Sequence, residues 1–321
     1  MTTLSTDWSR AMGLEVPILN APMGGVAGGA LAAAVSRAGG LGMVGIGSAG
    51  SELQLDEQLG HLRGLGRPFG IGLVEWVVAR EPRLLSAAIN AQPALLSVSF
   101  GEDFSWVRRA HDAGIAAGTQ AGNLRAAARA VEAGCDVVIA RGAEAGGHGE
   151  PTVGTLPLLA AILDHLSVPV LAAGGVSCGR ALAGVLAAGA SGAWLGTAFC
   201  ACTETLSSDN ARFALLAAQD TDTVTTRVFD IAQHYPWPAR IPERVLRNRF
   251  TDRWHGHEQE LSADPHAHEA LAAAIAADDH RMAPSNAGQG VAMLRTVRPG
   301  AEVIDEMCAD AHRLLNRRYT P

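Results

Sequence analysis

The sequence predicts an α/β protein built around a (β/α)₈ TIM barrel, with a second domain inserted after the eighth strand. Short apolar runs alternate with longer Ala-, Leu- and Arg-rich stretches from residue 17 to about residue 201. The longer stretches end near glycine, as in SRAGG, HDAG, VEAG and LAAG, which is typical of a left-handed helix C-cap. The rhythm breaks over residues 203–287, where Pro236, Pro238 and Pro242 precede a charged, His-rich part.

The apolar runs bounded by glycine indicate strands that are buried on both faces. Eight strand–helix units favour a closed barrel, and an open doubly wound sheet is the alternative, because the number of strands does not prove closure. The expected strands are PILNAPM at 17–23, LGMVGIG at 41–47, FGIGLVEW at 69–76, ALLSVSFG at 94–101, IAAGTQAG at 115–122, DVVIARG at 136–142, VPVLAAGG at 168–175 and GAWLGTAF at 192–199.

The domain boundaries follow from the same alternation of strand and helix patterns. We expect residues 1–202 and 288–321 to form the barrel, since the tail GQGVAMLRTVRPGAEVIDEMCADAHRLLNRR returns to helical periodicity. Residues 203–287 are expected to form a lid or insertion domain.

Composition excludes several classes of partner and chemistry. The 321 residues carry a formal net charge of −7 and no basic tract, so we expect no nucleic-acid partner. We see no secretory signal and no apolar window of about 20 residues, and we therefore expect a cytoplasmic protein that does not span a membrane. All 25 basic residues are Arg. The absence of Lys excludes a Schiff base on this chain and a Walker-type phosphate loop.

The carboxyl ends of the predicted strands define the expected active face, as in other barrels. This face is rich in glycine and nearly free of carboxylates, so a flat ligand or a phosphate can approach the backbone closely. The Gly-Gly turn after the strand at 168–175 leads into a helix, whose free N–H groups suit a phosphate. The alternative is that these glycines only permit close packing. The face includes Ala21, Pro22, Met23, Gly24, Ser99, Gln120, Ala173, Gly174, Gly175, Gly196 and Thr197.

The stretch GAEAGGHGE at 142–150 has the most specific pattern. Gly146 and Gly147 would bring the backbone close to a flat ring, and His148 would project over that ring. Histidine exchanges protons near neutral pH, which suits a catalytic acid or base. The alternative is a solvated loop histidine. Of the 11 histidines, His148 alone lies at the predicted barrel mouth within a glycine cluster, and Glu144 is expected to brace the loop.

Other His, Cys and aromatic residues carry weaker signals. HGHE at 255–258 and PHAHE at 265–269 place His at i and i+2, which do not share a helix face, and the five cysteines form no CxxC pair. We therefore expect no metal site. Trp76, Tyr235 and Trp237 are expected either to line a pocket or to pack the lid.

The motifs, taken in order, resemble those of the nitronate monooxygenases, flavoproteins once grouped as 2-nitropropane dioxygenases. The resemblance covers most of residues 15–200 and the tail near 287–295. It implies a TIM barrel that binds FMN non-covalently and oxidises alkyl nitronates, such as propionate 3-nitronate, with O₂ to a carbonyl compound and nitrite. The motifs are APMGGVAGGALAAAVSRAGGLGMVG, SFG, GTQAG, ARGAEAGGHGE, LAAGGVSCGRALAGVLAAGASGAWLGTAF and AGQGVAMLR.

The resemblance also implies roles for individual residues. His148 matches the family histidine that acts as a base or orients the substrate. Arg141 stands where many members carry Gln, and Gly149 stands where Arg is common. We expect Arg141 to pair with the flavin phosphate or with an anionic substrate, and Ser99 to contact the substrate. The positions that match flavin contacts are Ala21, Pro22, Met23, Gly24, Gln120, Gly142, Gly146, Gly147, Gly174, Gly175, Gly196 and Thr197.

Two other functions remain open at this point. One is an NAD(P)H-dependent flavin reductase that acts on a quinone or an enoyl thioester, because fold alone does not decide function. The other is a flavin- or ligand-binding protein without catalytic activity. The expected partners are a small-molecule substrate and O₂, and we expect a monomer or a homodimer.

Overall fold

Eight parallel strands form the central sheet of the computed structural model, which describes residues 4–316. Their order is β1-β9-β8-β6-β5-β4-β3-β2. The two ends of the sheet meet, because the Leu41 N–H donates to the Ile18 carbonyl at 3.0 Å and Leu19 bridges Leu41 in parallel. The predicted closed barrel is thereby confirmed. The strands are β1 (Ile18–Asn20), β2 (Gly42–Gly45), β3 (Phe69–Val74), β4 (Leu95–Ser99), β5 (Ala116–Ala121), β6 (Val137–Arg141), β8 (Val170–Ala173) and β9 (Gly192–Leu195).

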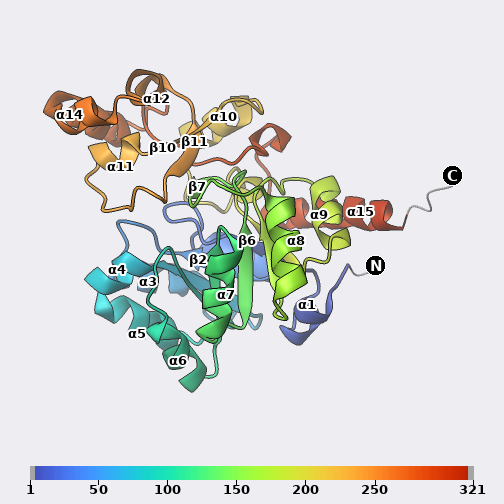
Figure 1. Cartoon of the computed structure of the whole chain (residues 1–321). Helices are drawn as coiled ribbons and strands as arrows, with labels where there is room; N and C mark the ends of the chain where they lie inside the picture. Colours follow the sequence, from blue (N-terminus) through green and yellow to red (C-terminus); the bar gives the residue numbers. More distant parts are fainter. Residues whose placement is uncertain (1–3, 317–321) are drawn as a thin grey trace.

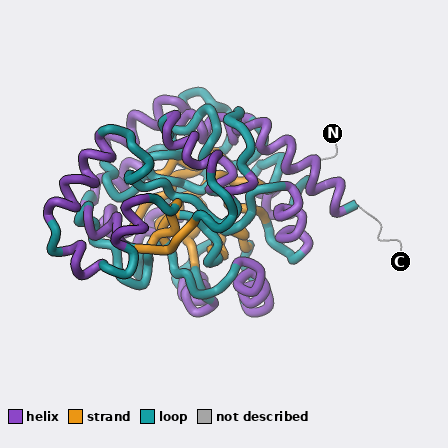
Figure 2. Tube along the Cα trace, turned by 90° about the horizontal axis from the view of Figure 1, so that it is seen from above, coloured by secondary structure: helices purple, strands orange, loops and turns teal. Residues whose placement is uncertain are grey.

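Helices surround this barrel, and the view from above shows the strands near the centre with helices and loops around them (Figure 2). The last described helix, α15, packs against α9 and α2 and so belongs to the outer layer. The helices of this layer are α1 (Asp7–Ala11), α2 (Gly29–Arg37), α3 (Glu52–Leu59), α4 (Glu75–Arg80), α5 (Pro82–Asn90), α6 (Ser105–Asp112), α7 (Leu124–Glu132), α8 (Thr155–His165), α9 (Gly179–Ala187) and α15 (Gly300–Leu315), with short 3₁₀ turns η1 (Gly60–Leu62), η2 (Thr197–Phe199) and η3 (Val291–Met293).

The barrel interior is filled by large apolar side chains at its lower levels, including Leu95, Ile139, Leu171 and Trp194. Successive inward-facing positions on a strand are two residues apart. This spacing identifies the next inward positions toward the carboxyl ends. Their side chains are small or polar, in contrast to the apolar layers below. They are Ala21, Ser97, Ser99, Gln120, Arg141, Ala173 and Gly196.

Residues 209–276 build a separate layer over the carboxyl ends of the strands (Figure 1). Its apolar cluster includes Val224, Phe229, Val245 and Phe250. Among the described helices, none is long and apolar enough to cross a membrane. The elements of this layer are α10 (Asp209–Ala217), β10 (Thr223–Thr226), α11 (Val228–Ala232), β11 (Glu243–Leu246), α12 (Arg249–Trp254), α13 (Glu258–Ser262) and α14 (Pro265–Ala276).

A three-stranded antiparallel sheet ties this layer to the barrel. Its order is β10-β11-β7, and β7 (Gly147–His148) belongs to the loop that follows β6. His148 lies opposite Glu243, and Gly147 lies opposite Arg244. The sequence did not predict β7, because a two-residue strand carries no periodicity of its own.

Candidate active site

A cavity of about 660 Å³ lies at the carboxyl ends of the barrel strands, beneath the layer that follows β9. This volume is typical of sites for small ligands and cofactors. Its wall contains every predicted site residue except Gly142: Ala21, Pro22, Met23, Gly24, Ser99, Gln120, Arg141, Gly146, Gly147, His148, Ala173, Gly174, Gly175, Gly196 and Thr197.

The structure places Gly142 against α8, outside the cavity wall. A Cβ atom at this position would lie 2.1 Å from Thr155 Oγ1 and 2.4 Å from the Thr155 nitrogen. Glu144 braces the same contact, because its carboxylate accepts hydrogen bonds from the Thr155 N–H and hydroxyl at 2.9 Å each. Gly142 therefore fixes the loop through close packing.

The turn after β8 exposes a series of backbone donors to the cavity. Gly174 and Gly175 have φ values of 110° and 69°, which strongly favour glycine. The N–H groups of residues 174–177 donate no hydrogen bond to any described residue. Successive free N–H groups next to a cavity form a concave anion site, and a phosphate fits it. Thr197 lies nearby on the wall, and its Oγ1 accepts a hydrogen bond from the Gly288 N–H at 2.9 Å.

The barrel strands supply a flat, mostly uncharged floor. Ala21, Ala173 and Gly196 leave room above the strand ends, while the side-chain amide of Gln120 has no hydrogen-bond partner in the described chain. A small floor beside a free amide fits a flat heteroaromatic ring with polar edges. Together with the N–H groups of residues 174–177, the donor set fits FMN.

His148 is held in place by residues from the layer above. Its Nε2 lies 2.9 and 3.0 Å from the two carboxylate oxygens of Asp230. Its ring stacks on Trp237, with centroids 3.7 Å apart and planes 9° from parallel. Trp237 in turn donates from Nε1 to Ser48 Oγ on the barrel at 3.1 Å. A solvated loop histidine is therefore excluded.

The bond to Asp230 determines which ring nitrogen is available to a ligand. An ionised carboxylate only accepts hydrogen bonds, so Nε2 carries the ring proton and donates a hydrogen bond to Asp230. Nδ1 has no hydrogen-bond partner among the described residues. Nδ1 is thus the ring atom that can exchange a hydrogen bond or a proton with a bound molecule.

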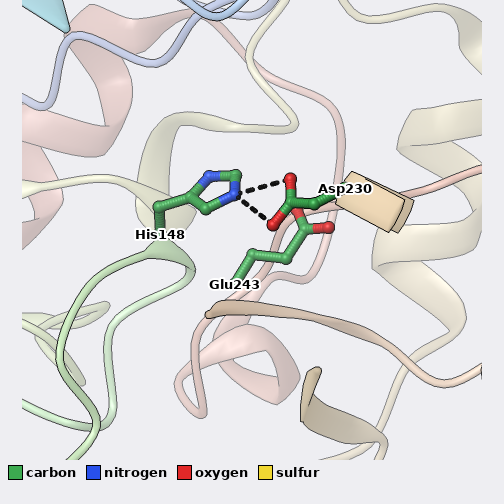
Figure 3. A group of neighbouring side chains, drawn as sticks. All are labelled: His148, Asp230 and Glu243. Carbon is green, nitrogen blue, oxygen red and sulfur yellow. Dashed lines mark hydrogen bonds and ion pairs between the residues drawn. The ribbon is translucent and has the colours of Figure 1, made fainter. Parts of the chain in front are cut away.

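Glu243 is the third member of this cluster (Figure 3). Burial, together with the charge of Asp230, raises the pKa of the Glu243 carboxyl well above its ordinary value. Its Oε1 is buried and has no hydrogen-bond partner. The raised pKa favours the neutral form of the Glu243 carboxyl beside Asp230, the residue that faces His148.

His148, Asp230 and Glu243 also form the one group in residues 4–316 whose spacing suits a metal ion, with ligand atoms within 4.8 Å of one another. Within this group Nε2 of His148 is bonded directly to Asp230, whereas Oε1 of Glu243 has no hydrogen-bond partner. In the His-rich part, His257 pairs with Glu260 at 2.8 Å on the exposed surface, and His268 bonds the Leu261 carbonyl at 2.9 Å.

Sequence reasoning missed Asp230 and Glu243. The barrel strands have few carboxylates at the site, as expected, but the layer above adds Asp230, Glu243 and Asp278 to the wall. The available signal was Asp230 inside the apolar run VFDIA, because burying a carboxylate there without a partner is energetically unfavourable.

The aromatic residues divide into two roles. Tyr235 and Trp237 line the cavity together with Phe100, whereas Trp76 packs behind them. Trp76 meets Trp237 edge-on at 5.6 Å between ring centroids, and Phe100 does so at 5.2 Å. The cluster holds Trp237 in the orientation that it presents to His148.

Comparisons with known proteins agree with this geometry. The family model described as nitronate monooxygenase matches residues 6–77 and 74–310. A nitronate monooxygenase of Paraburkholderia phytofirmans is 30% identical, with 92% of each chain covered. An indene-carboxyl-CoA dehydrogenase of Rhodococcus jostii is 31% identical over 73% of this chain and 66% of its own length. The solved structure of FabK from Thermotoga maritima superposes with a TM-score of 0.86 at 27% identity, covering 98% of both chains.

Proposed function

Since the chain belongs to the nitronate monooxygenase family, whose members are FMN flavoproteins, we propose that it uses FMN to oxidise alkyl nitronates with O₂. The products are a carbonyl compound and nitrite, and propionate 3-nitronate is a suitable substrate. The observation that carries the proposal is the position of His148, which is fixed on the cavity wall by Asp230 and Trp237 with Nδ1 left free.

The glycine-rich wall supports the choice of cofactor. The free N–H groups of residues 174–177 would hold the phosphate, and the floor of Ala21, Ala173 and Gly196 would take the ring. Gln120 would contact a polar edge of that ring. When bound, FMN supplies the electron transfer from the nitronate to O₂.

Under this proposal the protein side chains orient the nitronate and exclude water. A nitronate is already an anion, so its oxidation requires no strong base. His148 would orient the nitronate through Nδ1, and Asp230 would keep the ring in one orientation through Nε2. Tyr235 and Trp237 would exclude water from the reacting atoms, since both lie on the cavity wall.

A second candidate is an NAD(P)H-dependent flavin reductase that acts on a quinone or an enoyl thioester. The likeness to the CoA-ester dehydrogenase of Rhodococcus jostii favours it. The two candidates differ in what reduces the flavin, so they can be separated without knowing the physiological substrate.

Anaerobic mixing of the purified, flavin-loaded protein separates them. The protein should absorb at about 450 nm, a general flavin property. Propionate 3-nitronate should bleach this band, and admission of O₂ should release nitrite in step with substrate loss. Rapid bleaching by NADH or NADPH while the nitronate is inert would reject nitronate oxidation in favour of the reductase. Flavin that responds to neither, with no turnover of quinones, would indicate a binding protein.

A further inference from the structure

Arg141 is a buried cation without an acidic partner. It ends β6, is 6% exposed and lies on the cavity wall. One terminal nitrogen, Nη2, donates to the carbonyls of Ala145, Gly146 and Gly147 at 3.4, 3.0 and 2.8 Å. Within residues 4–316, its Nε and Nη1 donate no hydrogen bond, and the guanidinium forms no ion pair.

The charge on Arg141 persists near neutral pH. Burial, with a smaller contribution from Arg244, lowers the pKa of the Arg141 guanidinium to about 10. Arg244 does not compensate for this charge, because it is itself a cation and donates to the Ala143 carbonyl at 3.0 Å. A buried cation is costly unless an anion pairs with it. Three carbonyls bind one edge of the guanidinium, while Nε and Nη1 remain available.

Gly149 makes room for this guanidinium. A Cβ atom at Gly149 would lie 1.9 Å from Nη1 of Arg141 and 2.2 Å from its Cζ. A side chain at position 149 would therefore displace the guanidinium from the place where its Nη2 binds the carbonyls of residues 145–147. The small residue at 149 therefore permits the large one at 141.

We propose that Arg141, seated against Gly149, is a binding subsite for an oxyanion group of the molecule in the cavity. The planar guanidinium with free Nε and Nη1 matches the two oxygens of a carboxylate, a nitronate or a phosphate. The oxyanion comes either from the substrate or from the FMN phosphate. This subsite rests on the proposed function only because both use the same cavity as the binding site.

A pair of ligands with the same shape and different charge tests the proposal. Titration calorimetry on the flavin-loaded protein, at constant ionic strength, would compare the affinities for acetate and acetamide. If the substrate supplies the oxyanion, the wild type should bind acetate at least about ten-fold more tightly than acetamide. Arg141→Gln should abolish this preference, and Arg141→Lys should retain part of it. Arg83→Gln, at an exposed position on α5, is the matched control and should behave as the wild type.

The second arm identifies the source of the oxyanion. If the phosphate supplies it, Arg141→Gln should weaken FMN binding by about ten-fold or more while riboflavin binds as before. Loss of acetate preference with unchanged FMN binding assigns the substrate instead. Equal weakening of acetate and acetamide, with equal weakening of FMN and riboflavin, would leave Arg141 a purely structural role and overturn the subsite. An Arg141→Gln protein that binds acetate, acetamide, FMN and riboflavin as the wild type does would also overturn the subsite.

Because acetate binding needs no turnover, this test is independent of the reaction. Charge-dependent binding of acetate in a protein that releases no nitrite would reject nitronate oxidation while leaving the subsite in place. Nitrite release with no effect of Arg141→Gln on any ligand would reject the subsite alone.

Discussion

At the scale of single residues, His148 depends on a neighbour that lies 82 positions away in the chain, Asp230. A glycine-rich loop by itself would leave the imidazole free to rotate. The bond from Nε2 and the stacked Trp237 ring remove that freedom, so the orientation of the imidazole is set before a ligand arrives.

The first residue-scale prediction separates catalysis from cofactor binding. His148→Ala removes the Nδ1 group proposed to contact the nitronate but none of the proposed FMN contacts. We expect turnover to fall by about 10²-fold or more, while bound FMN per protein stays at the wild-type level. Steady-state nitrite release and the flavin absorbance measure the two quantities. Unchanged kinetics would remove His148 from the mechanism.

Asp230→Asn is the companion variant. The amide has nearly the size of the carboxylate, but it cannot supply a charge to Nε2. We expect kcat to fall by about ten-fold or more with full FMN content, because the imidazole loses its fixed orientation and proton placement. A role limited to folding would instead lower the amount of folded protein and leave kcat of the remainder unaltered.

At the scale of elements, local pattern was sufficient to locate the eight strands of the barrel, although it did not prove that the sheet closes. Each of the eight strands falls within its predicted range, because a buried strand bounded by glycine is marked by its own residues. The pairing of β7 with β11 was not accessible in this way. It joins residues 147–148 to residues 243–244, and no local periodicity indicates which distant segment a two-residue strand will meet.

The same distinction separates the predicted site residues from those that were missed. The rule that barrel sites lie at strand ends collected Gln120, Arg141 and Gly175 from their positions alone. Asp230 and Glu243 are placed by tertiary contacts of the layer above the barrel. The apolar run VFDIA singles out Asp230, but no sequence pattern links it to His148 or singles out Glu243. The packing role of Gly142 was also inaccessible, because it depends on the position of Thr155.

The turn after β8 yields the element-scale prediction. Asp at position 175 would place a carboxylate beside the free N–H groups that we assign to the phosphate. Asn at the same position has the same shape and the same backbone strain at φ 69° without the charge. We expect Gly175→Asp to bind FMN at least about ten-fold more weakly than Gly175→Asn, through repulsion of the two anions.

Ultrafiltration followed by flavin fluorescence measures the FMN dissociation constant of each variant. Gly184→Asp is the control for added charge, since a Cβ at this exposed α9 position meets nothing within 4 Å. It should bind FMN as the wild type does. If the Asp and Asn variants at position 175 bind FMN equally, the phosphate site does not lie at this turn.

At the scale of the whole molecule, the barrel and the layer above it line one cavity, the candidate active site. The barrel provides His148 and the cavity floor, and the layer provides Asp230, Trp237 and Glu243. Their junction runs through β7 and β11 as well as through the Trp237–Ser48 hydrogen bond. Displacement of the layer would therefore release His148, and under the proposed function this would couple the stability of the junction to catalysis.

Glu243 makes the stability of this junction depend on pH in a defined direction. Its folded-state pKa is raised above the ordinary value of 4.5 by burial and by Asp230. Between that ordinary value and the raised one, the folded protein keeps a proton that the unfolded chain has released. The folded state thus binds more protons, and the free energy of unfolding falls as pH rises through this window, by about 1.4 kcal/mol for each unit of pKa shift.

Glu243→Gln should remove this pH dependence, because the amide is neutral at every pH and close in size to the protonated carboxyl. Relative to the wild type, the variant should gain stability progressively as pH rises above about 4.5, the ordinary carboxyl value. Equilibrium urea unfolding at a series of pH values measures the difference, and the exposed Glu302→Gln on α15 should follow the wild-type curve. Parallel curves for Glu243→Gln and the wild type would mean that Glu243 is ionised in the folded protein. The cluster would then hold two buried negative charges, and a cation bound between His148, Asp230 and Glu243 would be needed to balance them.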